Sequence, residues 1–207
     1  MEKKSVPFVP AQKKGGHTGA QHSVKATNRK EALQIFEDAR KRLLNINRWQ
    51  NICGSGSAEF RLTDKNGQTL NFVKPRIGNL IRIKLPAPKN QSGKGFDWVR
   101  IEAFKHTKDQ LNDEEQYGFR VRPVQNPFEK DGESAHFYTS DASSTFLISR
   151  KGRILTAKEF GRNEIPNSNP QSLLNKIRNI IIAVAAMAGF AKPQWKKLMK
   201  GILEGNS

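Results

Sequence analysis

Two side chains that can exchange protons stand close together late in the chain. His136 and Tyr138 are two residues apart, just ahead of a turn rich in hydroxyl groups. Alternate residues of a strand face the same side, so a strand here places the imidazole and the phenol together. They could orient a ligand or act as general acid and base. A hydrogen-bonded rim without a chemical role explains the same pattern, and both interpretations stay open.

A polar loop follows the last predicted strand. Arg162 and Glu164 stand two residues apart among asparagines. An arginine placed in this way could clamp a carboxylate-bearing ligand. The alternative is that the two side chains tie the loop to the sheet.

The other reactive residue types do not form a recognisable site. Cys53 is the single cysteine and lies in a stretch of small residues without a nearby histidine. A reactive thiol needs a base or a positive field that lowers its pKa, so we expect Cys53 to be buried and unreactive. His17 and His22 lack carboxylate partners at metal-ligand spacing. The sequence therefore predicts no metal site and no cofactor.

Positive charge is the strongest compositional signal. The chain has a formal net charge of +17, and a chain of this kind attracts polyanions. If the apolar residues of the predicted strands face the core, five cations share the opposite face. A nucleic acid could bind this basic face, although the sequence favours a simple solvated surface somewhat more. The basic face consists of Arg82, Lys84, Arg100, Arg120 and Arg122.

The ends of the chain differ in their predicted structure. Residues 1–27 are rich in Lys, Gly, Gln and His, which predicts a disordered basic tail. Residues 28–207 are expected to form a single domain. Asn28 followed three residues later by Glu31 is typical of a helix start, and apolar residues continue at helical spacing to Leu44.

The middle of the chain predicts strands, because apolar and polar residues alternate in several short runs separated by turn-forming clusters. The C-terminal part predicts a long helix from residue 170, apolar over much of its circumference, with a second short helix after Pro193. Such a helix must be buried, and a sheet is the surface available to cover it. The expected fold class is α+β, with an antiparallel meander of six to seven strands curled around the C-terminal helix. The expected strand runs are residues 58–62, 70–73, 81–85, 98–104, 119–122, 136–138 with 144–149, and 153–160.

This order of elements resembles the START and polyketide-cyclase-like (SRPBCC, helix-grip) superfamily. The run LLNINRW at residues 43–49, followed by AEFRL at residues 58–62, is similar to the helix–Trp–strand opening common in that superfamily. At the level of element order the resemblance covers residues 28–203. It implies a cavity between the sheet and the last helix, which in many relatives holds an apolar or amphipathic small molecule.

We therefore expect a non-catalytic binding module for such a molecule. One alternative is a nucleic-acid or polyanion-binding protein that uses the basic face, and another is a small cyclase- or hydrolase-like enzyme. The N-terminus has no apolar run typical of a signal peptide, which favours a cytoplasmic protein without a membrane span. The residues expected to line the pocket are Ile83, Val99, Ile101, Phe119, Val121, His136, Tyr138, Ile177 and Ile181.

Overall fold

Seven antiparallel strands form one sheet in the computed structural model, which describes residues 7–54, 56–85, 95–129, 138–166 and 192–205. The strand order is β1-β7-β6-β5-β4-β3-β2, so every strand after the first pairs with its neighbour in the sequence. This arrangement confirms the predicted α+β fold with an antiparallel meander. The strands are β1 (Gly16–Lys25), β2 (Glu59–Thr63), β3 (Leu80–Lys84), β4 (Asp97–Asp109), β5 (Glu114–Pro123), β6 (Ser143–Lys151) and β7 (Ile154–Glu164).

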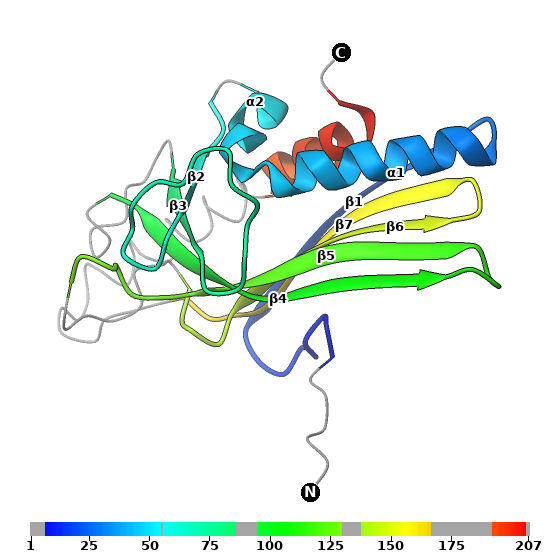
Figure 1. Ribbon diagram of the computed structural model, residues 1–207. Helices are drawn as coiled ribbons and strands as arrows, with labels where there is room; N and C mark the ends of the chain where they lie inside the picture. Colours follow the sequence, from blue (N-terminus) through cyan, green and yellow to red (C-terminus); the bar gives the residue numbers. More distant parts are fainter. Residues whose placement is uncertain (1–6, 55, 86–94, 130–137, 167–191, 206–207) are drawn as a thin grey trace, which may run out of the picture.

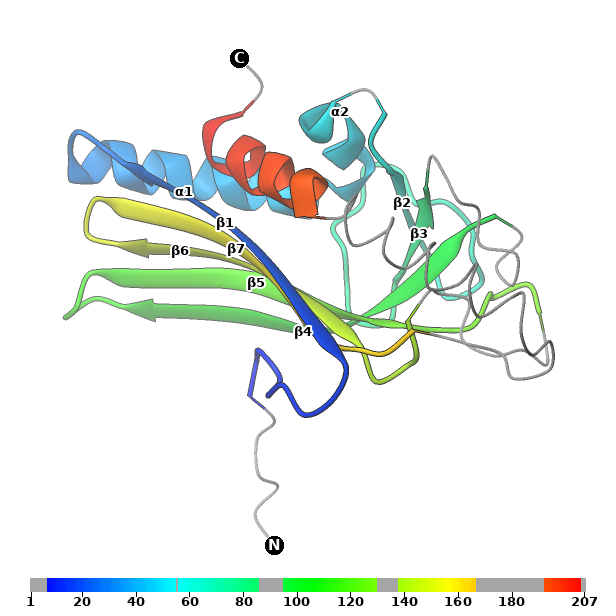
Figure 2. The ribbon, with the colours of Figure 1, turned by 180° about the vertical axis from the view of Figure 1, so that it is seen from behind.

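The described helices lie on one face of the sheet. Helix α1 (Arg29–Leu44) and the C-terminal helix of residues 192–204 run over this face, as Figure 1 shows, and residues 7–15 lie on the other face. Two short helical segments, η1 (Ile46–Arg48) and α2 (Trp49–Cys53), connect α1 to β2. Figure 2 shows the C-terminal helix beside α1 from behind. The helix-covered face is called the inner face below.

Local contacts fix both helices. Asn28 caps α1 as predicted, because its side-chain oxygen accepts a hydrogen bond of 2.9 Å from the Glu31 N–H. The Glu31 carboxylate reaches back to the N–H of Thr27 at 2.6 Å. At the other end of α1, the Arg42 guanidinium donates to the carbonyls of Ile202 and Leu203 at 2.9 and 3.1 Å. Carbonyls at a helix end lack partners within the helix, so this arginine joins the end of the C-terminal helix to α1.

The interior lies between the inner face and the helices. Phe36 of α1, Phe119 of β5 and Leu198 of the C-terminal helix are each at most 1% exposed. Ile101 and Phe119, both expected to line a pocket, are fully buried here. Ile177 and Ile181 lie outside the described residues, so the expected burial of that part of the last helix stays a prediction.

The predicted disordered tail was wrong for residues 16–25, which form β1. This strand pairs antiparallel with β7 from Gly16, opposite Glu164, to Lys25, opposite Ile154. An edge strand has only one neighbour, and much of its stability comes from its backbone hydrogen bonds, so it needs few apolar residues. Ala20 is 8% exposed, and small apolar residues of this kind gave too weak a signal in the sequence.

The strand expected at residues 70–73 does not form. An isolated bridge joins Thr63 to Thr69, and the chain then leaves the sheet. Phe72 has a φ of 58° and is fully exposed, and Val73 is 45% exposed. A left-handed residue interrupts regular pairing, and Pro75 has no N–H to donate. These residues therefore belong to the loop between β2 and β3.

A candidate ligand-binding cavity

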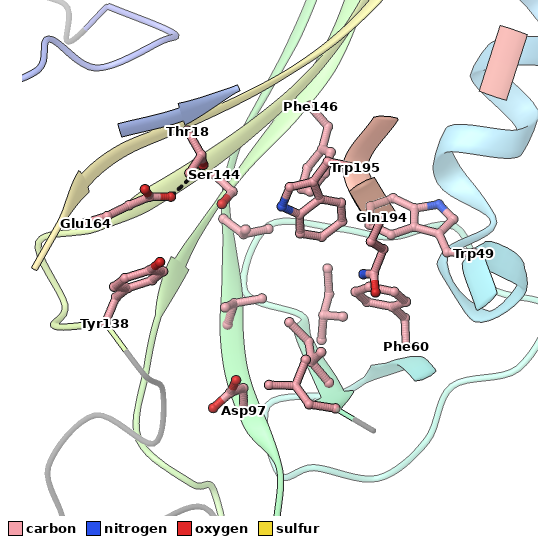
Figure 3. A pocket seen from close by; sticks show the side chains of 15 residues that line it. Thr18, Trp49, Phe60, Asp97, Tyr138, Ser144, Phe146, Glu164, Gln194 and Trp195 are labelled. Carbon is pink, nitrogen blue, oxygen red and sulfur yellow. Dashed lines mark hydrogen bonds between the residues drawn. The ribbon is translucent and has the colours of Figure 1, made fainter. Parts of the chain in front are cut away.

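A cavity of about 90 Å³ lies between the inner face of the sheet and the start of the C-terminal helix. Apolar side chains of β2 to β5 form its floor, and Figure 3 shows the side chains that line the cavity. They reach the cavity because alternate residues of each strand face the same side. The apolar residues from these strands are Phe60, Ile81, Ile83, Val99 and Val121.

Four aromatic side chains that line the cavity contact one another in a closed cycle, called the aromatic cluster below. Trp49 lies 5.3 Å from Phe60 and 4.9 Å from Phe146, measured between ring centroids. Trp195 of the C-terminal helix completes it, at 6.0 Å from Phe60 and 5.3 Å from Phe146. The helix start is held in place because the side-chain oxygen of Gln194 accepts a 2.9 Å hydrogen bond from the Ala58 N–H.

The opposite side of the cavity is polar because of an irregularity in β7. Thr18 of β1 pairs with Gly161, and Gly16 pairs with Glu164, so β7 has one residue more than β1 in this interval. Such an extra residue is a β-bulge, and here Asn163 adopts a φ of 55°. Regular alternation would place Gly161 and Glu164 on opposite faces. The bulge instead brings the Glu164 carboxylate to the inner face, where Thr18 donates a 2.7 Å hydrogen bond to it.

Gly161 makes room for this pair. A Cβ atom at position 161 would lie 2.2 Å from both Glu164 Oε1 and Thr18 Oγ1. Figure 3 shows Glu164 directed toward Thr18, with Ser144 and Tyr138 nearby. A larger residue at 161 would therefore displace the carboxylate.

Glu159 is a second acid on the inner face of β7. It pairs with Ala20 on one side and Phe146 on the other, and it is 1% exposed. No hydrogen bond of good geometry reaches its carboxylate oxygens from the described residues, although the Ser144 hydroxyl is close enough to favour ionisation. Burial, aided by the charge of Glu164, raises the pKa of Glu159 to about 8. The side chain is therefore mostly protonated at pH 7.

Tyr138 lines the cavity close to these acids. Burial raises its pKa to about 12, and the charges of Glu164, Glu159 and Asp97 contribute to the same shift. The phenol therefore keeps its proton at neutral pH. Asp97, 2% exposed, is another lining residue. Burial also raises the pKa of Glu164, against the opposing effects of Thr18, His17 and Arg162.

The expected pocket residues fall into three groups. Ile83, Val99, Val121 and Tyr138 line the cavity, and Ile101 and Phe119 are buried elsewhere in the core. His136, Ile177 and Ile181 lie outside the described residues. The sequence did not predict the aromatic cluster or the inward position of Glu159. A signal for Glu159 was present, because it alternates with Leu155, Ala157 and Gly161 at inward positions of its strand.

The two members of the predicted polar loop are separated by the bulge. Arg162 donates to the Gly161 carbonyl at 2.7 Å, and its guanidinium lies 5.3 Å from the centre of the Phe160 ring. Within the described residues no ion pair joins it to Glu164. Arg162 thus stabilises the strand end, whereas Glu164 lines the cavity.

The basic face lies opposite the cavity, and most of its members have partners. Glu102 pairs with Arg122 at 3.0 Å and with Arg120 at 3.4 Å. Arg120 also donates to the carbonyls of Pro7 and Phe8, both at 3.1 Å. Lys84 pairs with Glu59 at 3.3 Å, Arg82 lies 4.7 Å from the centre of the Phe96 ring, and Arg100 is exposed. Four of the five cations thus have contacts within the molecule, and a nucleic-acid partner gains no support.

The remaining reactive residues form no second site in the described part of the chain. Cys53 is 2% exposed, and burial raises the pKa of its thiol to about 12, as expected for an unreactive cysteine. Among the described residues, no group of three or more His, Cys, Asp or Glu side chains could hold a metal ion. None of the described helices is long and apolar enough to cross a membrane.

No protein-family model matches this chain, and no curated protein does either. Solved structures that align include a hypothetical protein from Helicobacter pylori, at 10% identity and a TM-score of 0.38, covering 91% of this chain and 97% of that one. Norcoclaurine synthase from Thalictrum flavum aligns at 10% identity and a TM-score of 0.35, covering 91% and 88%. Ginseng major latex-like protein 151 from Panax ginseng aligns at 9% identity and 0.32, covering 84% and 99%. Such low identities and TM-scores identify neither a family nor a ligand, and the helix-grip-like arrangement of this chain rests on its own sheet order and helix placement.

Proposed function

We propose that this chain binds a small apolar or amphipathic molecule in the cavity between the inner face of the sheet and the C-terminal helix. The observation that carries the proposal is a cavity with an apolar floor, an aromatic wall and a polar side. Binding sites for small molecules have this composition, with few polar groups that orient the ligand.

The cost of the cavity supports the same proposal. An apolar cavity of about 90 Å³ lowers stability by roughly 2 kcal/mol relative to a filled core. One longer side chain on the floor would fill much of it. A cavity that a single substitution could remove is expected where binding matters more than stability.

The test uses benzyl alcohol, a neutral probe of suitable size, in isothermal titration calorimetry. The wild-type chain should bind it, and Val99→Phe, which fills the floor of the cavity, should abolish binding without lowering the melting temperature. Ile154→Phe is the matched control, because Ile154 is 52% exposed on β7, outside the cavity. Equal binding to Val99→Phe, or failure of benzyl alcohol and of its charged analogues benzylamine and benzoate to bind the wild type, would refute the proposal.

A further inference from the structure

The charged side chains among the described lining residues are opposite in sign to the net charge of the whole chain. The sequence has 36 Lys and Arg against 19 Asp and Glu. The described lining residues nevertheless include two carboxylates, Asp97 and Glu164, and no Lys, Arg or His. His17 and Arg162 lie near enough to lower the pKa of Glu164, but neither lines the cavity. A ligand that enters this space meets negative charge from the described side chains.

The backbone of β7 departs from regular pairing at the residue that directs Glu164 inward. The left-handed conformation of Asn163 is strained in a residue other than glycine. Without the bulge, Glu164 would point away from the cavity. Bulges commonly re-aim a side chain beside a binding site. Together with Gly161, which leaves space for the carboxylate, this local structure positions an acid at the cavity wall.

Glu159 adds a second acid next to the wall, and this acid is mostly protonated at pH 7. It lies on the inner face, its neighbour Phe146 lines the cavity, and its oxygens have no hydrogen bond of good geometry from the described residues. Burial raises the pKa of both Glu159 and Glu164, and the charge of Glu164 adds to the shift of Glu159. A cation beside Glu164 would offset this charge and favour ionisation of both groups. Its binding would therefore release protons into the solvent.

The aromatic cluster also favours a positively charged ligand. The face of an aromatic ring attracts a cation, and groups of such rings recognise organic ammonium ions. The cavity also limits the size of the ligand, because its volume of about 90 Å³ is well below the roughly 300–1,000 Å³ of drug-sized sites. A molecule of about the size of one substituted ring is compatible with this space.

We propose that the ligand of this cavity is a small apolar amine, bound as a cation with its ammonium group beside Glu164 and Tyr138 and its apolar part against the aromatic cluster. This inference rests on the proposed function, since it names the class of ligand for the same cavity. Tyr138 accepts through its phenol oxygen, and Glu164 accepts while its other contact, from Thr18, holds it in place.

Three probes of nearly the same size and different charge test the inference. Benzylamine is a cation at neutral pH, benzyl alcohol is neutral, and benzoate is an anion. In calorimetric titrations, benzylamine should bind about tenfold more tightly than benzyl alcohol or better, because hydrogen bonds to charged groups are stronger. Benzoate should bind most weakly. Titrations in two buffers of different ionisation enthalpy should show that benzylamine releases protons and benzyl alcohol does not.

Variants of Glu164 distinguish the contribution of its carboxylate to binding from that of the cavity itself. Glu164→Gln should bind benzylamine and benzyl alcohol equally, and Glu164→Asp, a smaller change that tests the same group if the first variant does not fold, should reduce the preference. Glu114→Gln is the control, because Glu114 pairs with Lys151 at the far end of the sheet and should leave the preference unchanged. Equal affinity of the wild type for amine and alcohol, or a preference that survives in Glu164→Gln, would overturn the amine inference and leave the proposed function intact. Failure of all three probes to bind would refute the proposed function itself.

Discussion

Replacing Glu159 by Gln should stabilise the chain, by an amount that grows with pH. The usual pKa of a Glu side chain is 4.5, and burial raises that of Glu159 to about 8. Below pH 4.5, both the folded and the unfolded chain carry the proton, so pH has no effect through this group. Between these values the unfolded chain loses the proton and the folded chain keeps it. The folded state then binds more protons, and its stability must fall as pH rises.

The magnitude follows from the size of the shift. One pKa unit corresponds to about 1.4 kcal/mol, so the loss is about 3 kcal/mol at pH 7 and levels off near 5 kcal/mol above pH 8. Glutamine has nearly the same shape and no charge. The free energy of unfolding of Glu159→Gln should therefore equal that of the wild type near pH 4.5 and exceed it increasingly above.

Urea denaturation of both chains at several pH values between 4.5 and 8.5 measures this difference. Glu37→Gln, a change on the surface of α1, controls for the loss of one carboxylate and should give a flat difference across the range. A flat difference for Glu159→Gln, or a variant less stable than the wild type at pH 8, would show that a compensating cation reaches Glu159 and would refute the reasoning.

Three further predictions concern the edge strand, the C-terminal helix and the bulge. Deletion of residues 1–27 should lower stability by roughly 3 kcal/mol or more, because it removes β1 and leaves β7 unpaired; an unchanged urea midpoint would contradict this, and deletion of residues 1–6 is the control. Leu198→Ala should cost about 2–5 kcal/mol, since Leu198 is 0% exposed, whereas the exposed Lys196→Ala should cost little; equal midpoints would show that the helix is not packed as described. Gly161→Ala should weaken benzylamine binding about as much as Glu164→Gln, because its Cβ would displace the carboxylate; unchanged binding would show that the contact with Thr18 is not needed.

Alternation and capping signals in the sequence predicted most of the fold. The Asn28 cap and the apolar positions of α1 gave the first helix, and the period-two runs gave β2 to β7. The same reasoning failed for β1, since an edge strand is stabilised by its neighbour's backbone and not by its own apolar residues. It also failed at Phe72, where a left-handed residue ends a run of strand-forming residues.

The candidate site was less predictable than the fold, for a related reason. Val99 and Val121 follow from strand alternation, because their faces depend only on local periodicity. Tyr138 also lines the cavity, but it lies outside the strands, in an isolated bridge to Pro166. Trp49 and Trp195 come from separate helical segments, and only packing brings them together. Glu164 is harder still, since its face depends on one extra residue in β7, and register shifts of this kind depend on the partner strand.

Three unfavourable features of the structure occur in one region. The cavity, the buried Glu159 and the left-handed Asn163 each lower stability. Glu159 and Asn163 lie on β7, and the cavity adjoins them through its lining residues Phe146 and Glu164. Each could be removed by a single substitution: a larger side chain at Val99, glutamine at Glu159, or glycine at Asn163. Packing alone gives no reason for them to occur together. A ligand that fills the cavity and carries positive charge would offset the unfavourable free energy of the cavity and of the buried Glu159. The same ligand would contact Glu164, which the bulge at Asn163 directs toward the cavity.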